Sequence, residues 1–139
     1  MLTLSELELR ILSELEEAGA EDVVTMLITV MEPVGDVTEV HDLQRALTTL
    51  VQADLVRMSM DRNSSGKLRS LSEEESLEVI ADLRSGLRFD RDKKYWKDTR
   101  QSGPPFGSPF PYIIATPPGK DRAFNILDER GYQWWRRKK

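Results

Sequence analysis

Apolar residues recur about every 3.6 positions between residues 36 and 53, and this period predicts an amphipathic helix. Asp36 stands at the N-cap position and Glu39 follows three residues later, so the spacing also predicts a capping box. The apolar stripe consists of Val40, Leu43, Leu47, Leu50 and Val51. The polar face carries Thr38, His41, Asp42, Arg45, Thr48 and Gln52. The helix therefore has one face for a core and one face that is free.

Two further helices are predicted before this one. Ser5 and Glu8 repeat the capping-box spacing at the start of the first helix, and Gly19 suits its end. The second helix is expected over residues 21–32, because its apolar residues have helical spacing and Pro33 cannot continue a helix. Nearly all of this second helix is apolar, so burial between its two neighbouring helices is expected.

A strand and another capped helix are predicted after the helix at residues 36–53. The alternating run at residues 55–60 is typical of a strand that enters a hairpin, and residues 61–66 have the composition of a turn. Ser72 and Glu75 again have capping-box spacing, and helical spacing of apolar residues continues to about residue 87. This helix would be an insertion into a smaller domain.

The next part of the chain is predicted to form a long basic hairpin. Residues 95–99 and 112–115 would be its two strands, and the Pro- and Gly-rich segment 101–111 would be its mobile tip. Six Lys or Arg residues and three Asp residues lie between positions 88 and 100. The hairpin would therefore carry a net positive charge.

A last helix is expected between Thr116, as its N-cap, and Gly131, as its stop. Its inward-facing residues would be Ala123, Phe124 and Leu127. The tail that follows combines Trp134 and Trp135 with four consecutive basic residues. Because large apolar side chains are rarely left in water, we expect an intramolecular or dimer contact for the two tryptophans.

The charge balance is acidic overall but uneven along the chain. The net charge is -4 and the pI about 5.1, which taken alone argues against a nucleic-acid-binding protein. Residues 1–60 hold 12 acidic and 3 basic residues, whereas residues 61–139 hold 12 acidic and 17 basic ones. The two halves are therefore oppositely charged, and the positive half contains the predicted hairpin.

Cysteine usage and hydropathy bound the location of the protein. The chain has no cysteine, which excludes disulfides and thiolate metal sites and fits a cytoplasmic protein. The N-terminus has no signal-like pattern, and no run approaches the roughly 18 to 20 apolar residues of a membrane span. We expect a cytoplasmic location and no membrane association.

No pattern of catalytic or cofactor-binding residues is apparent. His41 is the single histidine, and without a nucleophile-elbow motif we interpret it as a solvated surface residue. A metal site made of Glu39, His41 and Asp42 is disfavoured, because residues one or two positions apart do not share a helix face. Phosphate-binding loops and dinucleotide fingerprints are absent. We therefore expect neither an enzyme nor a cofactor.

The order of helices and strands, with two short motifs, resembles the winged helix-turn-helix family of DNA-binding domains, and its MarR-like and PadR-like branches most. The family's Ala-Leu-x-x-Leu followed by Gly-Leu-Val has a counterpart in residues 46–50 and 54–56, with Asp54 in place of Gly. Its Leu-Thr-x-x-Gly before a last helix resembles residues 115–119, with Ala115 in place of Leu.

The resemblance covers the two ends of the chain and leaves the middle third without a counterpart. The fold it implies is mainly α with a small β-hairpin or sheet (α+β). Residues 1–139 would form a single winged-helix domain, in which residues 61–110 are an insertion and an extended wing.

A winged-helix resemblance implies a transcriptional regulator that binds double-stranded DNA as a homodimer. The helix at residues 36–53 would read bases, and the basic hairpin would hold phosphates. The dimer would form through the terminal helices together with Trp134 and Trp135. The residues expected to contact DNA are Thr38, His41, Arg45, Thr48, Thr49, Arg91, Lys93, Lys94, Lys97 and Arg100.

Acidic residues support an alternative interpretation. Glu39 and Asp42 would face phosphate repulsion in a groove, unless one of them accepts a hydrogen bond from cytosine. The outer face of the first helix is expected to carry Glu6, Glu14, Glu16 and Glu17 and to lie away from a duplex. The alternative is a winged-helix protein-interaction module that does not bind DNA and that uses the helix at residues 72–87 and the tryptophan tail.

Overall fold

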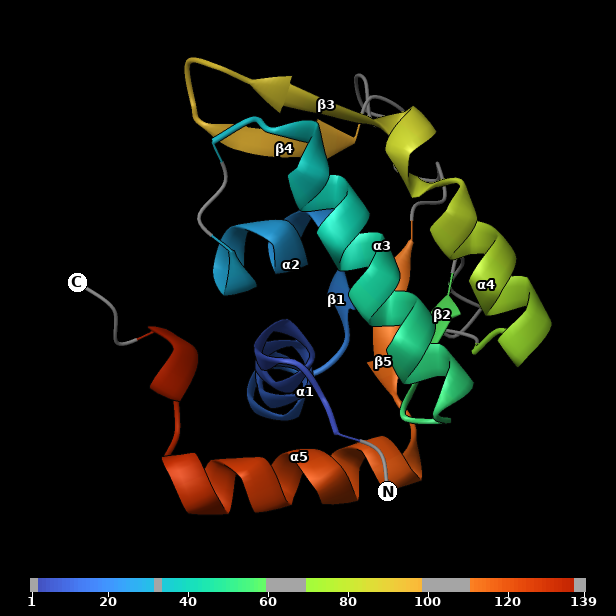
Figure 1. Cartoon of the computed structure of the whole chain (residues 1–139), viewed down its shortest axis with the longest axis vertical. Helices are drawn as coiled ribbons and strands as arrows, with labels where there is room; N and C mark the ends of the chain where they lie inside the picture. Colours follow the sequence, from blue (N-terminus) through green and yellow to red (C-terminus); the bar gives the residue numbers. More distant parts are fainter. Residues whose placement is uncertain (1–2, 32–33, 60–69, 99–110, 137–139) are drawn as a thin grey trace, which may run out of the picture.

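The computed structural model describes residues 3–31, 34–59, 70–98 and 111–136 (Figure 1). They form mainly helices with a small antiparallel sheet, which confirms the mainly helical α+β class. The α-helices are α1 (Glu6–Ala18), α2 (Val23–Val30), α3 (Val37–Gln52), α4 (Glu73–Ala81) and α5 (Pro117–Arg130), and the 3-10 helices are η1 (Leu83–Gly86) and η2 (Trp134–Arg136). The strands are β1 (Glu21–Asp22), β2 (Val56–Ser59), β3 (Leu87–Asp90), β4 (Tyr95–Asp98) and β5 (Tyr112–Ala115).

Side-chain caps start the helices close to where the sequence predicts them. Reciprocal capping boxes form at the starts of α1 and α4, and the hydroxyl of Thr116 caps α5. α2 is shorter than its apolar pattern predicts, because Glu21 and Asp22 pair with β5 as a short strand. α2 therefore begins at Val23, where the Asp22 carboxylate accepts the N–H of Thr25.

α3 begins at the predicted residue but with different cap chemistry. The Asp36 carboxylate accepts the N–H of Thr38 at 2.9 Å, and hydrogen bonding with Thr38 holds the pKa of Asp36 below its ordinary value of 3.8. In the expected capping box, the Glu39 carboxylate would accept the backbone N–H of Asp36. In the structure it instead accepts the N–H groups of Val34 and Gly35. The turn before α3 therefore folds back over the first turn of the helix.

β5 is the central strand of the sheet, with β1 on one side and β2 on the other, both antiparallel. The predicted pairing of residues 95–99 with 112–115 is wrong, because β4 pairs with β3 and β5 pairs with β2. β3 and β4 are close in the sequence, so the hairpin between them closes a short loop at low entropic cost. The predicted turn at residues 61–66 and the tip at 101–110 lie outside the described residues.

The core lies around α1, which Figure 1 views nearly end-on between α5, α2 and the sheet. Ile11 and Leu12 of α1 are fully buried there, as is Ile113 of β5. The prediction that Phe124 faces inward is wrong, because this side chain is 56 % exposed and Ile126 is buried instead. The inward positions of α5 are Ala123, Ile126 and Leu127, as the i, i+3, i+4 spacing of one helix face requires.

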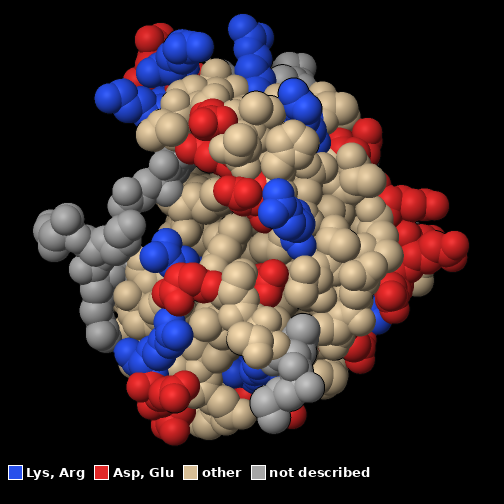
Figure 2. Space-filling view, in the orientation of Figure 1, with Lys and Arg blue, Asp and Glu red and all other residues tan. Residues whose placement is uncertain are grey.

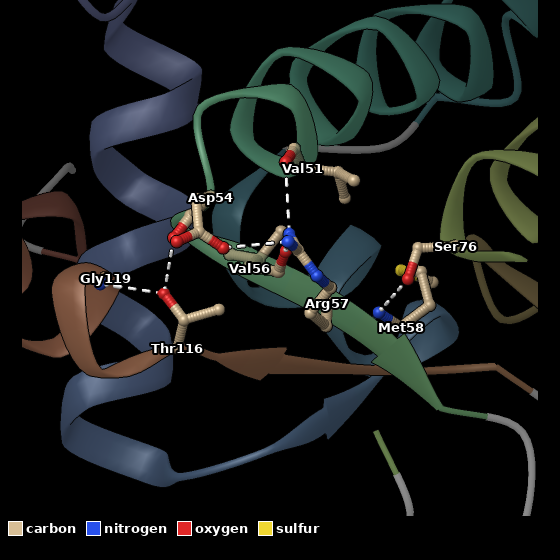
Figure 3. A network of polar contacts seen from close by, with 8 residues as sticks. All are labelled: Val51, Asp54, Val56, Arg57, Met58, Ser76, Thr116 and Gly119. Carbon is tan, nitrogen blue, oxygen red and sulfur yellow. Dashed lines mark hydrogen bonds and ion pairs between the residues drawn. The ribbon is translucent and has the colours of Figure 1, made fainter. Parts of the chain in front are cut away.

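α4 is shorter than predicted, and η1 takes up the chain that follows it. The Gln44 side chain of α3 donates a hydrogen bond to the Ile80 carbonyl at 2.7 Å. The N–H of Met58 in β2 donates to the Ser76 hydroxyl at 2.9 Å (Figure 3). α4 is therefore fastened to α3 and to β2.

A polar network joins the end of α3 to the start of α5 (Figure 3). Asp54 stands just after the end of α3 with a φ of 63°, and its carboxylate pairs with Arg57 at 2.7 Å. Arg57 also donates to the Val51 carbonyl at 3.1 Å. The Thr116 hydroxyl donates to the Asp54 carbonyl at 2.6 Å and accepts the N–H of Gly119 at 3.0 Å. Consequently α3, β2 and α5 are linked at one junction.

The C-terminal tryptophans pack on α1 of their own chain. Trp134 donates its indole N–H to the Ser13 hydroxyl at 2.9 Å, and Trp135 donates to the Glu14 carboxylate at 3.0 Å. Glu14 is fully buried, so the expectation that it lies on the outer face of α1 is wrong. Trp135 is 2 % exposed and has almost no surface left for a second chain.

Candidate nucleic-acid interface

Two residues predicted to contact DNA form an exposed stripe on α3 together with Asp42. Thr38, Asp42 and Arg45 are all exposed, and their spacing of three or four positions places them on one helix face. Thr49 continues the stripe by one turn but is half-buried. The exposed part of this stripe that faces the start of α3 therefore consists of Thr38, Asp42 and Arg45.

The flank of α3 next to η1 and α4 holds the other two predicted contact residues on this helix. His41 is exposed, and its Nε2 lies 3.5 Å from a guanidinium nitrogen of Arg84 in η1. Thr48 is half-buried and lies one turn beyond Gln44, which is bonded to α4. His41 is therefore better placed than Thr48 to contact a ligand on the outer surface.

Glu39 does not belong to the outer face of α3. Its side chain is 9 % exposed and accepts hydrogen bonds from Val34 N–H at 2.7 Å, Gly35 N–H at 3.2 Å and Trp96 Nε1–H at 2.8 Å. This carboxylate therefore does not form part of the exposed surface of α3. Of the two carboxylates that argued against DNA, Asp42 is the one that remains exposed.

The β3–β4 hairpin lies against α2 and contacts the turn before α3 and Glu39 in the first turn of α3. Phe89 and Trp96 lie opposite each other in the hairpin, with ring centroids 5.4 Å apart and planes at 67°. Trp96 is 7 % exposed and reaches Glu39, whereas Phe89 lies against Gly35. A Cβ atom at Gly35 would lie 2.7 Å from Phe89 Cδ2, which shows how closely the backbone and the ring approach.

The turn and outer side of the hairpin carry exposed basic side chains. The Asp90 carboxylate accepts the N–H groups of residues 92 and 93, both at 3.0 Å, and this bonding fixes the turn. The side chain of Lys97 and the whole of Arg100, both expected to contact DNA, lie outside the described part of the structure. The exposed basic residues of the hairpin are Arg88, Arg91, Lys93 and Lys94.

Acidic side chains gather at one edge of this face of the molecule. Figure 2 shows mainly red side chains along the right-hand edge, over α4, and blue side chains with some red ones along the upper edge, over the hairpin. The exposed acidic residues of α4 are Glu73, Glu74, Glu75 and Glu78. A polyanion would therefore be attracted to the hairpin end of α3 and repelled by the side that α4 covers.

Arg84 is a basic residue of this surface that was not among the expected contacts. It is exposed and lies beside His41, in the 3-10 helix that leads from α4 into the hairpin. The sequence places Arg84 at the end of a helix, and the turn of η1 is what brings it to α3. The sequence feature that could have identified Arg84 is its position four residues before the basic segment 88–100.

The described residues offer little for other chemistries. Within them, no group of three or more His, Asp or Glu side chains is arranged to hold a metal ion. Arg88, Phe89, Asp90 and Arg91 line part of an open hollow of about 500 Å³ beside the hairpin. None of the described helices is long and apolar enough to cross a membrane.

Comparisons of the chain with protein-family models, with curated proteins and with solved structures found no match.

Proposed function

We propose that this protein binds double-stranded DNA as a transcriptional regulator of the winged helix-turn-helix type. α3 is the recognition helix in this proposal, and the β3–β4 hairpin contacts the phosphate backbone beside it. The observation that carries the proposal is the docking of a basic hairpin at the N-terminal end of an exposed helix face that bears Arg45.

The geometry of α3 supports the proposal. In helix-turn-helix proteins, the N-terminal residues of the second helix contact base edges in the major groove. Thr38 and Asp42 are exposed in the N-terminal half of α3 and Arg45 is exposed at its middle, and α2 with the turn at residues 34–36 precedes the helix. Arg45 offers bidentate hydrogen bonds to guanine, and Asp42 offers an acceptor to the amino group of cytosine.

The order of elements gives further support. β2 follows α3 directly and pairs with β5, which leads through Thr116 into α5. This is the order that the resemblance implies for the two strands of a wing and the helix after it. In this proposal, α4, η1 and the hairpin are inserted between the two wing strands.

A salt-dependent binding experiment tests the proposal. Fluorescence anisotropy would be measured with labelled random-sequence duplexes over a series of salt concentrations. Because each neutralised phosphate releases counterions, log K should fall with log salt at about 0.9 per phosphate contact. Absence of binding at low salt would contradict the proposal.

A protein-docking role without DNA is a second candidate function. Val34 is 76 % exposed and Val37 38 % exposed, and both lie at the start of α3 beside the hairpin. Exposed apolar residues next to one another are typical of protein-binding surfaces. This candidate predicts that Val34→Asp abolishes capture of a partner, while the protein shows no salt-dependent binding to DNA.

We also propose that the protein is a homodimer that uses its terminal helices. Trp134 and Trp135 are used within the chain, so the contact would lie on α5, where Phe124 is 56 % exposed. A two-fold dimer of helix-turn-helix units would contact two half-sites about one helical turn of DNA apart.

A further inference from the structure

The Glu39 carboxylate joins two segments that are far apart in the chain. Its Oε2 accepts the N–H of Val34, and its Oε1 accepts the N–H of Gly35 and the indole N–H of Trp96. Two of these donors belong to the turn before α3, and the third belongs to β4, 57 positions away. One buried side chain of α3 therefore holds both the entry to the helix and the hairpin.

The hairpin contributes a second contact at the same place. Phe89 and Trp96 are paired in register, so their rings lie on the same face of the hairpin. That face meets Gly35 and Glu39, while the neighbouring Arg88 is exposed. The apolar face of the hairpin therefore meets the start of α3 as well as α2, and the described cations Arg88, Arg91, Lys93 and Lys94 are exposed.

The buried Glu39 carboxylate needs hydrogen-bond donors to be stable. A buried carboxylate is costly unless its oxygens are hydrogen-bonded, and removal of one donor leaves the group partly unsatisfied. If the hairpin moved away from α3, Glu39 would lose the donor that Trp96 supplies. The position of the hairpin is thus coupled to a buried charge on α3.

We propose that Glu39 and Trp96 are positioning residues that lock the basic hairpin to the recognition helix, so that both meet one duplex as a single rigid surface. This inference rests on the proposed DNA-binding function. Neither residue contacts DNA in this proposal, because both are buried. They act through the cations of the hairpin, whose distance from Arg45 they fix.

Two matched variants test the lock. Trp96→Phe removes the indole N–H that reaches Glu39 and retains an aromatic ring. Trp134→Phe makes the same chemical change at a tryptophan that donates to Ser13 on α1. A general weakening of packing would affect both variants, whereas failure of the lock would affect Trp96→Phe alone.

The first measurement needs no DNA. Hydrogen exchange of backbone amides 87–98 should be about fivefold faster or more in Trp96→Phe, as expected when one hydrogen bond is removed, and unchanged in Trp134→Phe. Unchanged exchange in the hairpin of Trp96→Phe would overturn the lock. Because this readout is independent of ligand, it separates a failed lock from a failed DNA-binding proposal.

The second measurement is the salt dependence of binding to a labelled duplex. Trp96→Phe should reduce the slope of log K against log salt by about 1 to 2, since a loosened hairpin makes fewer phosphate contacts. Its preference between duplex sequences should be retained, because Arg45 is untouched. A normal slope with a loosened hairpin would overturn the positioning role.

Glu39→Gln provides a second route if Trp96→Phe does not fold. The amide keeps one oxygen acceptor but presents an NH₂ group to at least one of the three donors. It should loosen the same amides and reduce the salt slope in the same direction. If wild type binds no DNA at any salt concentration, the proposed function fails and the positioning role fails with it, whatever the exchange data show.

Discussion

Arg45 is the single Lys or Arg residue of α3 and is exposed, so its substitution tests base reading directly. Arg45→Ala should reduce discrimination between preferred and random duplexes by about 1–3 kcal/mol, the usual contribution of a bidentate contact with guanine. Binding competition at constant salt measures this difference. Arg45→Lys is the matched control, because it keeps the charge and removes the fork of donors. Equal discrimination by all three proteins would exclude Arg45 from base reading.

Asp36 offers a prediction about pH at the start of α3. Hydrogen bonding with Thr38 lowers the pKa of Asp36 in the folded state, so the ionised carboxylate stabilises the fold at pH values above its unfolded pKa. That contribution disappears as pH falls through the lowered folded-state pKa. Urea unfolding between pH 6 and pH 3 should therefore show wild type losing its advantage over Asp36→Asn at the acid end. A constant difference over this range would contradict the role of the charge.

Glu39 shows what the residue pattern leaves open. On a helical wheel it is a polar residue near the outer face, and its spacing from Asp36 favours a capping box. In the fold, the turn at residues 34–35 and Trp96 surround it, and it becomes a buried acceptor. Glu14 behaves in the same way beneath Trp135. Neither case follows from local pattern, because the donors come from distant or folded-back segments.

The junction between elements places Gly119 against the chain that leaves α3. A Cβ atom at Gly119 would meet the Leu55 carbonyl oxygen, a backbone atom, so α5 would have to shift. Gly119→Ala should lower the free energy of unfolding by about 2–3 kcal/mol or more, in the range of overpacked sites. Gly19→Ala is the control, because nothing lies within 4 Å there and only the positive φ is strained. Denaturant unfolding would rank the two variants, and equal destabilisation would contradict the close approach at Gly119.

Positive charge can be removed from the turn of the hairpin without a change in the core. Its turn residues are exposed, so Arg91→Ala, Lys93→Ala and Lys94→Ala together should weaken binding to every duplex. The salt slope should fall by about 0.9 for each phosphate that is no longer neutralised, and by at most about 3. The control is Lys120→Ala with Arg122→Ala on α5, at the opposite end of the view in Figure 1. An effect in proportion to the number of charges removed, three in the hairpin and two on α5, would indicate net charge alone.

The sequence did not predict which strands pair with one another. Residues 95–98 and 112–115 both have strand character, and local pattern does not say which partner each takes. The choice depends on β2, whose buried Val56 and Met58 face the core and pair with β5. With β5 occupied, β4 pairs with the adjacent β3.

At the scale of the whole molecule, the exposed Phe124 on α5 makes self-association testable. If α5 forms the proposed dimer contact, Phe124→Asp should lower the sedimentation mass from dimer to monomer at micromolar concentration. Ile28→Asp on α2, at a site 43 % exposed, is the matched control and should leave the mass unchanged. A monomeric wild type would refute the dimer, and a dimeric Phe124→Asp variant would exclude this face.

The sequence by itself determined where the helices lie and most of their limits, because caps, stops and the helical period are local. The limits of α2 and the end of α4 differed from the local pattern. The sequence predicted the capping boxes at Ser5 and Ser72, the start of α3 at Asp36 and the stop at Asp54. It also predicted that positive charge gathers between residues 88 and 100.

Tertiary structure decided which surface that charge joins. The hairpin lies against α2 and reaches the start of α3, where Trp96 supplies Glu39 with a donor from outside its own helix. The tertiary structure also packs α4 against α3 and places the acidic side chains of α4 at one edge of the candidate interface. Such contacts between residues distant in the sequence depend on packing and hydrogen-bond satisfaction across the fold, which no local period encodes.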